Sequence, residues 1–121
     1  MNLATVEIKA FVPARDLQRS LAFYAALGFQ VPWASDALAY VHHGNTSFLL
    51  QAFDAPGFAD QYMMHMLVED VDDWHRHVCA SGVVERFGVR LGKPEDRPWR
   101  IRDFVLSDPG GVLWRIGQNI D

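Results

Sequence analysis

The feature that most constrains this chain is an internal repeat. The stretch FVPARDLQRSLAFYAALG, residues 11–28, aligns with HMLVEDVDDWHRHVCASG, residues 65–82, and the offset of 54 residues superimposes Asp16 on Asp70. Each copy has an apolar strand, an aspartate where a helix begins and a glycine where it ends. Aspartate caps free backbone N–H groups, and glycine adopts the left-handed conformation that closes a helix. The repeat therefore predicts two copies of one strand–helix unit.

The apolar residues between these marks have helical spacing. Leu17 and Leu21 fall on one face of the first expected helix, and Val71, Trp74 and Val78 fall on one face of the second. Both helices are followed by strand-like runs bounded by turn residues, which are residues 28–33, 37–43 and 46–53 in the first copy and 83–91, 101–107 and 111–118 in the second. The pattern predicts βαβββ twice, which is an α+β fold.

Turn residues and chain length set the expected domain organisation. His-His-Gly-Asn at 42–45 and Asp-Pro-Gly-Gly at 108–111 are typical of hairpin connections. A chain of 121 residues has the size of one domain. We expect a single domain over residues 1–121, with module one at about 1–58 and module two at about 59–121.

Composition argues against several classes of protein. Half of the residues are hydrophobic, and the net charge of −4 comes without a lysine or arginine block, which disfavours a nucleic-acid surface. No apolar run approaches the roughly 18–20 residues that span a bilayer, and the first residues lack the pattern of a signal peptide. Cys79 is the single cysteine, so a disulfide within the chain is impossible and a reducing compartment is favoured. We expect a cytoplasmic protein without nucleic-acid or membrane partners.

Three segments carry a resemblance to a known family. They are VPARDLQRSLAFYAALG (residues 12–28), VEDVDDW (68–74) and DPGGVLWRIG (108–117). Together with the repeat, they resemble the vicinal oxygen chelate superfamily, which includes glyoxalase I, bleomycin-resistance proteins and extradiol dioxygenases. The run GKPEDRPWRIRDFVLSDPGG and the ending LWRIGQ are most similar to the bleomycin-resistance type. The resemblance implies a curved eight-stranded mixed sheet, helices on its outer face, a ligand site on its concave face and, commonly, a homodimer.

The resemblance also places the family's metal-binding positions on this chain. They would fall at Lys9, at Met63, at Arg115 and within residues 49–51. Arginine offers no lone pair, and divalent metals prefer carboxylate oxygen or imidazole nitrogen. Two cations aimed at one cavity would also repel a metal ion. We therefore expect neither a metal nor another cofactor.

A different metal site built from histidines is the main alternative. It would lie around His65, His42 or His43 and would serve a metal-dependent lyase or dioxygenase. His42 and His43 are adjacent, so their side chains diverge on a strand. A single cavity histidine without two partners is more often a hydrogen-bonded cavity residue. A third alternative is a degenerate scaffold that binds a protein partner.

Strand alternation assigns the side chain of Arg115 to the concave face. By the same alternation, Lys9 and Phe11 on the first strand and Met63 and His65 on the fifth strand face the same way. The resemblance assigns ligand stacking to Trp99 and to Trp33. The candidate ligand-binding residues are Lys9, Phe11, Trp33, Gln51, Met63, His65, Trp99 and Arg115.

The charges expected in this cup bear on the ligand. Lys9 and Arg115 would make the floor basic, which favours a flat or aromatic ligand with an acidic group over a cationic antibiotic such as bleomycin. In the alternative interpretation Arg115 pairs with Asp103 on the preceding strand, and a neutral ligand fits. We expect a metal-free homodimer that sequesters an aromatic or antibiotic-like ligand at the dimer interface, a binding protein rather than an enzyme.

Overall fold

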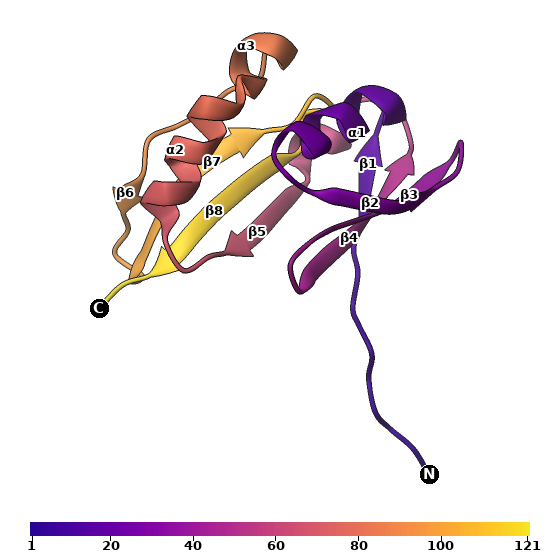
Figure 1. Cartoon of the computed structure of the whole chain (residues 1–121), viewed down its shortest axis with the longest axis horizontal. Coiled ribbons are helices and arrows are strands. Elements are labelled where there is room, and N and C mark those ends of the chain that lie inside the picture. Colours follow the sequence, from indigo (N-terminus) through magenta and orange to yellow (C-terminus); the bar gives the residue numbers. More distant parts are fainter.

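The computed structural model describes residues 1–121, and each half runs strand, helix and three further strands (Figure 1). Module one contains β1 (Phe11–Ala14), α1 (Leu17–Ala26), β2 (Gln30–Ala34), β3 (Leu38–His43) and β4 (Thr46–Ala52). Module two contains the short helix η1 (Ala59–Gln61), β5 (Met63–Leu67), α2 (Val71–Ser81), α3 (Val83–Phe87), β6 (Glu95–Asp96), β7 (Ile101–Ser107) and β8 (Leu113–Asn119). None of the helices is both long and apolar enough to cross a membrane.

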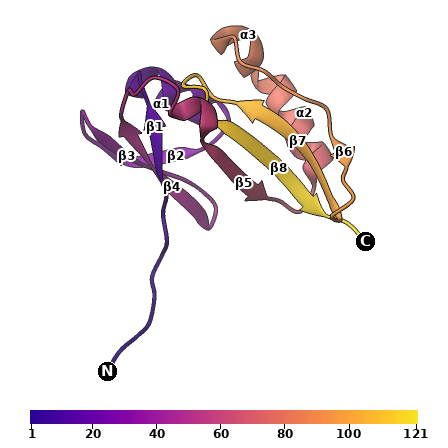
Figure 2. The ribbon, with the colours of Figure 1, turned by 180° about the vertical axis from the view of Figure 1, so that it is seen from behind.

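Each module forms its own mixed sheet. The strand orders are β1-β4-β3-β2 and β5-β8-β7-β6, and in each sheet the first strand of the module pairs in parallel with the last. The predicted α+β class and its two βαβββ modules are confirmed. Within one chain the eight strands make two four-stranded sheets, because β1 and β5 are edge strands that do not pair with each other. The first residues of the chain extend away from both sheets (Figure 2), whereas Glu7, Lys9 and Ala10 contact β3 and β4.

The predicted helix ends are confirmed in atomic detail. Asp16 precedes α1 and its Oδ1 accepts a hydrogen bond from the backbone N–H of Arg19 at 3.1 Å. Asp70 does the same for α2, with the N–H of Asp73 at 3.0 Å. Gly82 closes α2 with φ of 76°, a conformation that favours glycine. The repeated Asp and Gly therefore fix where both long helices begin and end.

The strand expected over residues 83–91 is wrong. Its first half is the helix α3, and Leu91 makes only an isolated bridge to Leu106. Val83 and Phe87 are spaced four residues apart, so a helix buries both on one side, and Phe87 packs edge-to-face on Phe23 of α1. The remaining strand, β6, is only two residues long. Tertiary packing against α1 has overridden the local preference of valine for strands.

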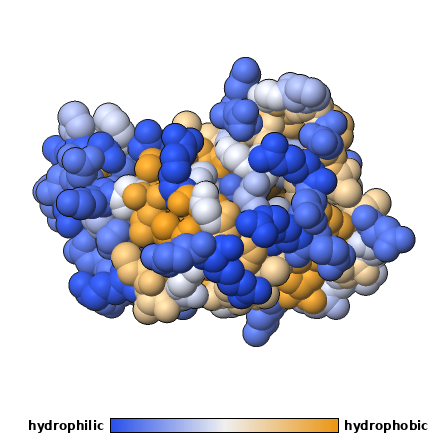
Figure 3. Space-filling model, turned by 90° about the horizontal axis from the view of Figure 1, so that it is seen from above, coloured by the Kyte–Doolittle hydropathy of each residue, from blue (hydrophilic) through white to orange (hydrophobic).

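One apolar core lies between the helices and the sheets. Helix α1 packs on β2 and β4, and α2 packs on β7 and β8, so each sheet has one covered and one open face. Strand β8 follows this division, since Trp114 and Ile116 are buried whereas Arg115 between them is partly exposed. Seen from above, most of the surface is hydrophilic, and apolar side chains gather on one part of it (Figure 3).

A buried polar junction joins the two modules. The hydroxyl of Tyr24 on α1 donates to Oδ2 of Asp108 at 2.6 Å and accepts from Nε1 of Trp114 at 2.8 Å. Asp108 also accepts from the backbone N–H groups of Gly110 and Val112, which holds the Asp-Pro-Gly-Gly turn. Burial raises the pKa of Asp108 above its ordinary value and raises that of Tyr24 well above its own. All these buried polar atoms therefore have partners across the module boundary or within the turn.

Candidate functional site

The candidate residues on strands lie on the two open faces. We define the module-one face as the helix-free side of the β1-β4-β3-β2 sheet, and the module-two face as the helix-free side of the β5-β8-β7-β6 sheet. Strand alternation sends the core residues to the opposite, helix-covered sides. The two faces can therefore be described independently, each from its strand register.

An aromatic row crosses the module-one face. The register places Phe11 opposite Leu49, Leu49 opposite Tyr40, and Tyr40 opposite Trp33. Phe11 and Trp33 each expose 53% of their surface. Directly opposed residues on one face of a sheet are close enough to interact. The row is therefore a continuous apolar strip, and Gln51 lies beside it, exposed and opposite Leu38.

Imidazole, guanidinium and thioether groups occupy the module-two face. The register places His65 opposite Arg115, and Arg115 opposite Val105. Met63 lies one row away, opposite Leu113. Met63 and His65 are exposed and Arg115 is partly so. The structure thus brings these three candidates together on one face.

Arg115 is paired rather than free. Its Nη1 lies 3.4 Å from Oδ2 of Asp103, whose Oδ1 accepts a hydrogen bond from Nε of Arg97 at 2.8 Å. Asp103 is only 2% exposed, and its hydrogen bond with Arg97 raises the pKa of that guanidinium. Charge-assisted bonds of this kind are stronger than neutral ones. The Arg115–Asp103 pairing considered from the sequence is present, and 34% of the Arg115 side chain remains exposed.

Lys9 also has a carboxylate partner. Its ammonium group forms an ion pair with Glu7 and lies 5.3 Å from the centre of the Tyr40 ring. Glu7 accepts a further hydrogen bond from Oγ of Ser47 at 2.7 Å. The hydrogen bond from Lys9, followed by that from Ser47, lowers the pKa of Glu7. The predicted basic floor is therefore wrong, because both of its cations are paired.

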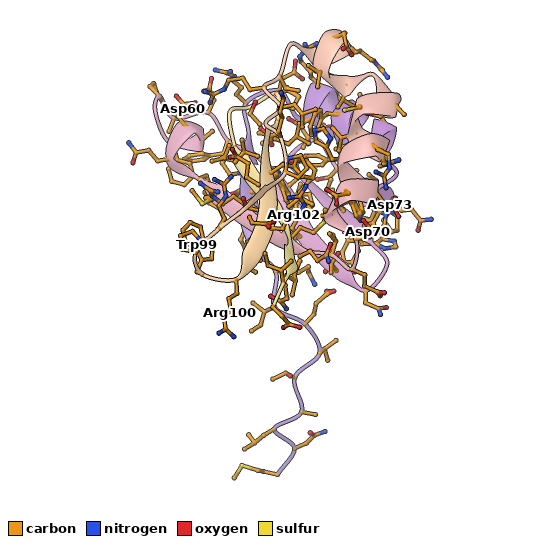
Figure 4. The ribbon with its side chains drawn as sticks, turned by 90° about the vertical axis from the view of Figure 1, so that its left-hand side faces the viewer. Asp60, Asp70, Asp73, Trp99, Arg100 and Arg102 are labelled. Carbon is orange, nitrogen blue, oxygen red and sulfur yellow. The ribbon has the colours of Figure 1, made fainter.

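Trp99 lies in the loop between β6 and β7. It exposes 63% of its surface and projects away from the body of the chain, next to Arg100 (Figure 4). Arg100 has φ of 66°, a left-handed conformation that non-glycine residues seldom adopt, so the loop turns sharply here. Within one chain the indole of Trp99 is thus largely free to contact a ligand or another molecule.

The eight candidates do not share one cavity within a single chain. Those on β1, β2 and β4 belong to the first sheet, and those on β5 and β8 belong to the second. Three cavities of about 370 to 410 Å³ are lined by none of the eight. The candidate residues therefore form two separate half-sites.

The histidines of the alternative metal site do not converge. The ring of His43 packs 4.9 Å from Trp74 and 5.3 Å from Phe29, at the boundary of the modules. His42 lies beside Tyr40 on β3, and His65 is on the other sheet. No three His, Cys, Asp or Glu side chains are grouped so that they could hold a metal ion. The displaced site considered from the sequence is not assembled within a single chain.

Sequence reasoning missed four residues on these faces. Tyr40 and Leu49 complete the aromatic row, and both alternate with buried residues of β3 and β4, a period of two that could have revealed them. Arg97 and Glu7 pair with the predicted charges from a loop and from the extended N-terminal segment. Arg97 lies in a loop, and alternation around Glu7 does not say which side chains it contacts, so these two ion pairs could be found only from the structure.

Comparison with known proteins places these observations in a family. The model of the Glyoxalase/Bleomycin resistance protein/Dioxygenase superfamily matches residues 6–116. A bleomycin resistance protein of Klebsiella pneumoniae is 27% identical over 113 residues, which cover 89% of this chain and 88% of the relative.

Solved structures agree with this match. The fold is similar to that of a bleomycin-binding protein complexed with bleomycin, with a TM-score of 0.81, 25% identity and coverage of 95% and 99% of the two chains. It is also similar to a bleomycin resistance determinant encoded on the transposon Tn5, with a TM-score of 0.76, 23% identity and coverage of 95% and 98%. The predicted likeness to the bleomycin-resistance type is confirmed. The chain belongs to the Glyoxalase/Bleomycin resistance protein/Dioxygenase superfamily.

Proposed function

We propose that this protein binds and sequesters an aromatic, antibiotic-like ligand in the cytoplasm, without a metal, in a cup that two copies of the chain form together. The observation that carries the proposal is the aromatic row on the module-one face, in which Phe11 and Trp33 are exposed and Tyr40 is partly exposed. Exposed rings that gather on one face mark binding surfaces and stack on flat ligands. A solved relative with bleomycin bound supports a ligand of this general kind.

The paired charges widen the range of ligands. Because Lys9 and Arg115 each have a carboxylate partner, neither presents an uncompensated positive charge to a ligand. The sequence-based reason to disfavour a cationic antibiotic therefore no longer applies. Bleomycin-type compounds belong among the first ligands to test.

A cup at a dimer interface is supported by the separation of the two half-sites and by residues 1–10. In that segment Val6 and Ile8 are 99% and 92% exposed, and they alternate with Glu7 and Lys9. Such alternation, with β-branched apolar residues on one side, is typical of a strand that lacks its partner. In the proposed dimer, the module-one face of one copy opposes the module-two face of the other.

Ligand binding is tested with bleomycin, 2-naphthoate and a neutral naphthalene carboxamide, each followed by thermal shift and by tryptophan fluorescence. We expect stabilisation by at least one compound, and loss of most of it in Trp33→Ala and in Trp99→Ala. Phe58→Ala is the matched control, since Phe58 is a similarly exposed ring outside both faces. A binding signal unchanged in both tryptophan variants would overturn the proposed site.

The shared cup has a sharper test in mixed dimers. If each cup joins module one of one copy to module two of the other, a Trp33→Ala chain mixed with a Trp99→Ala chain forms one cup with both tryptophans intact. Binding should then return at up to half of the wild-type stoichiometry in the mixed species. A cup formed within one chain would show no recovery, and a monomer in analytical ultracentrifugation would contradict the dimer.

The proposal of a metal-free site rests on the side chains at the family's metal positions. Lys9 and Arg115 are cationic donors, and Met63 offers a thioether that hard divalent ions disfavour. Elemental analysis of the purified protein checks this directly. A stoichiometric divalent metal that chelators remove together with thermal stability would overturn it.

A further inference from the structure

The two open faces together carry balanced charge. Their cations are Lys9, Arg97 and Arg115, and their carboxylates are Glu7, Glu95 and Asp103. Arg97 contacts two of these carboxylates, with Nη1 at 3.2 Å from Glu95 and Nε at 2.8 Å from Asp103. Each of these three cations thus has a carboxylate within ion-pair distance, and the six groups together carry no net charge.

Asp103 occupies the central place in this arrangement because Gly117 leaves room for it. The register pairs Asp103 with Gly117 on β8 and with Glu95 on β6. A Cβ at position 117 would lie 3.1 Å from Cβ of Asp103 and 3.0 Å from Cγ2 of Ile101, closer than most real contacts. Glycine therefore lets the carboxylate sit at the floor of the face, 2% exposed, with both arginines above it.

The pairing leaves hydrogen-bond donors available on Arg115. Only its Nη1 contacts Asp103, at 3.4 Å, and 34% of the side chain is exposed beside His65. A guanidinium has five N–H donors in a fixed plane, so the others can donate to a planar carbonyl or amide. The positive charge of the guanidinium, however, is already offset by the carboxylate behind it.

We propose that Asp103 determines the charge class of the ligand, so that the site admits neutral or cationic planar aromatic ligands bearing carbonyl or amide acceptors and rejects aromatic carboxylates. This inference rests on the proposed function, because it concerns the same site. A ligand carboxylate that reached Arg115 would lie close to the carboxylate of Asp103, which is only 2% exposed and therefore little screened by water. Like charges at such a distance repel, and no uncompensated cation on either face offsets the repulsion.

The test compares three probes with one ring system: 2-naphthamide, 2-naphthoate and 2-naphthylmethylammonium. For the wild type we expect 2-naphthoate to bind about tenfold more weakly than 2-naphthamide, or worse. In Asp103→Asn the two arginines lose their buried partner, and the preference should move toward 2-naphthoate by about the same factor. In Arg115→Gln it should move toward the ammonium probe, because one cation is removed and the carboxylates stay.

Arg102→Gln is the matched control. Arg102 precedes Asp103 on β7 and points to the opposite, helix-covered side, where it pairs with Asp72 and Asp96. Figure 4 labels Arg102. Its removal should leave the probe preference unchanged. If Asp103→Asn does not fold, as judged by circular dichroism, Arg97→Gln serves instead and should weaken 2-naphthoate further.

The outcomes separate this inference from the function on which it rests. Tighter binding of 2-naphthoate than of 2-naphthamide by the wild type would overturn the role of Asp103 while leaving the aromatic site in place. An equal shift of preference in Arg102→Gln would also overturn it, because the effect would then be one of overall charge. Binding of none of the probes, nor of bleomycin, would instead remove the proposed function and the inference together.

Discussion

The two modules share a scaffold and differ in what their open faces carry. Both have a capping aspartate, a long helix and a parallel pairing between their first and last strands. Module one presents an aromatic row, whereas module two presents Arg115, His65 and a buried Asp103. The helix caps and the alternating core residues stabilise the helix-covered side of each sheet. They place no requirement on the side chains of the open side, which differ between the two modules. The comparison teaches that the repeat encodes the frame, while the ligand chemistry resides in residues that do not repeat.

The largest expected effect concerns the junction that makes the two modules one unit. Tyr24→Ala removes a fully buried ring from module one and its hydrogen bonds to Asp108 and Trp114 of module two. We expect a loss of about 3–5 kcal/mol in the free energy of unfolding, measured with urea. Tyr24→Phe keeps the ring but leaves Oδ2 of Asp108 without a donor, and should lose about 1–3 kcal/mol. Equal losses in the two variants would mean that the hydrogen bonds, not the ring, join the modules.

The next effect tests the floor of the module-two face. Gly117→Ala places a methyl group against Ile101 and Asp103, and we expect it to destabilise the protein by about 1–3 kcal/mol. Gln51→Ala on the module-one face is the control, because an exposed side chain there should change stability by less than about 0.5 kcal/mol. Urea unfolding of both variants compares the faces directly. If both variants lose equally little stability, Ile101 and Asp103 can move to accommodate the added methyl group.

The two capping aspartates allow a direct comparison of how α1 and α2 are stabilised in the two modules. Asp16→Ala and Asp70→Ala each remove one side-chain acceptor for a backbone N–H, and we expect each to destabilise the protein by about 1 kcal/mol. Asp36→Ala is the control, because Asp36 is exposed and caps no helix. Chemical denaturation of the three variants gives the free energy of unfolding of each. A loss confined to one cap would show that the repeated aspartates are not equivalent.

The smallest expected effect is a dependence on pH. Burial raises the pKa of Asp108 in the folded protein, so the folded state binds its proton more tightly than the unfolded state does. The stability that this group contributes is present below its unfolded pKa of about 4 and is lost as pH rises toward the folded value. Asp108→Asn should lack that fall. The measurement is the slope of the unfolding free energy against pH just above pH 4, in the wild type and in Asp108→Asn. Parallel slopes in the two proteins would contradict the role of Asp108.

The sequence predicts the frame better than the site, for a physical reason. Asp16, Asp70 and Gly82 act within one turn of chain, so their roles follow from local spacing, and β7 lies where alternation placed it. The helix at 83–87 was missed because Phe87 is drawn into it by packing on a helix distant in sequence. The charges of the cup were misjudged for a similar reason. Arg97 and Glu7 reach their partners from segments outside the strands, and only the folded chain sets those contacts.

The edge strands of the two sheets differ in how well they are protected against pairing with another strand. Of the four outer strands, β1 contains Pro13 and β2 contains Pro32, residues without an N–H to offer a neighbour, and β6 is two residues long. Strand β5, with the run Met63–Leu67, has none of these protections. Any additional strand that joins this molecule, whether from a proper companion or from a misfolded one, has a single well-formed place to dock.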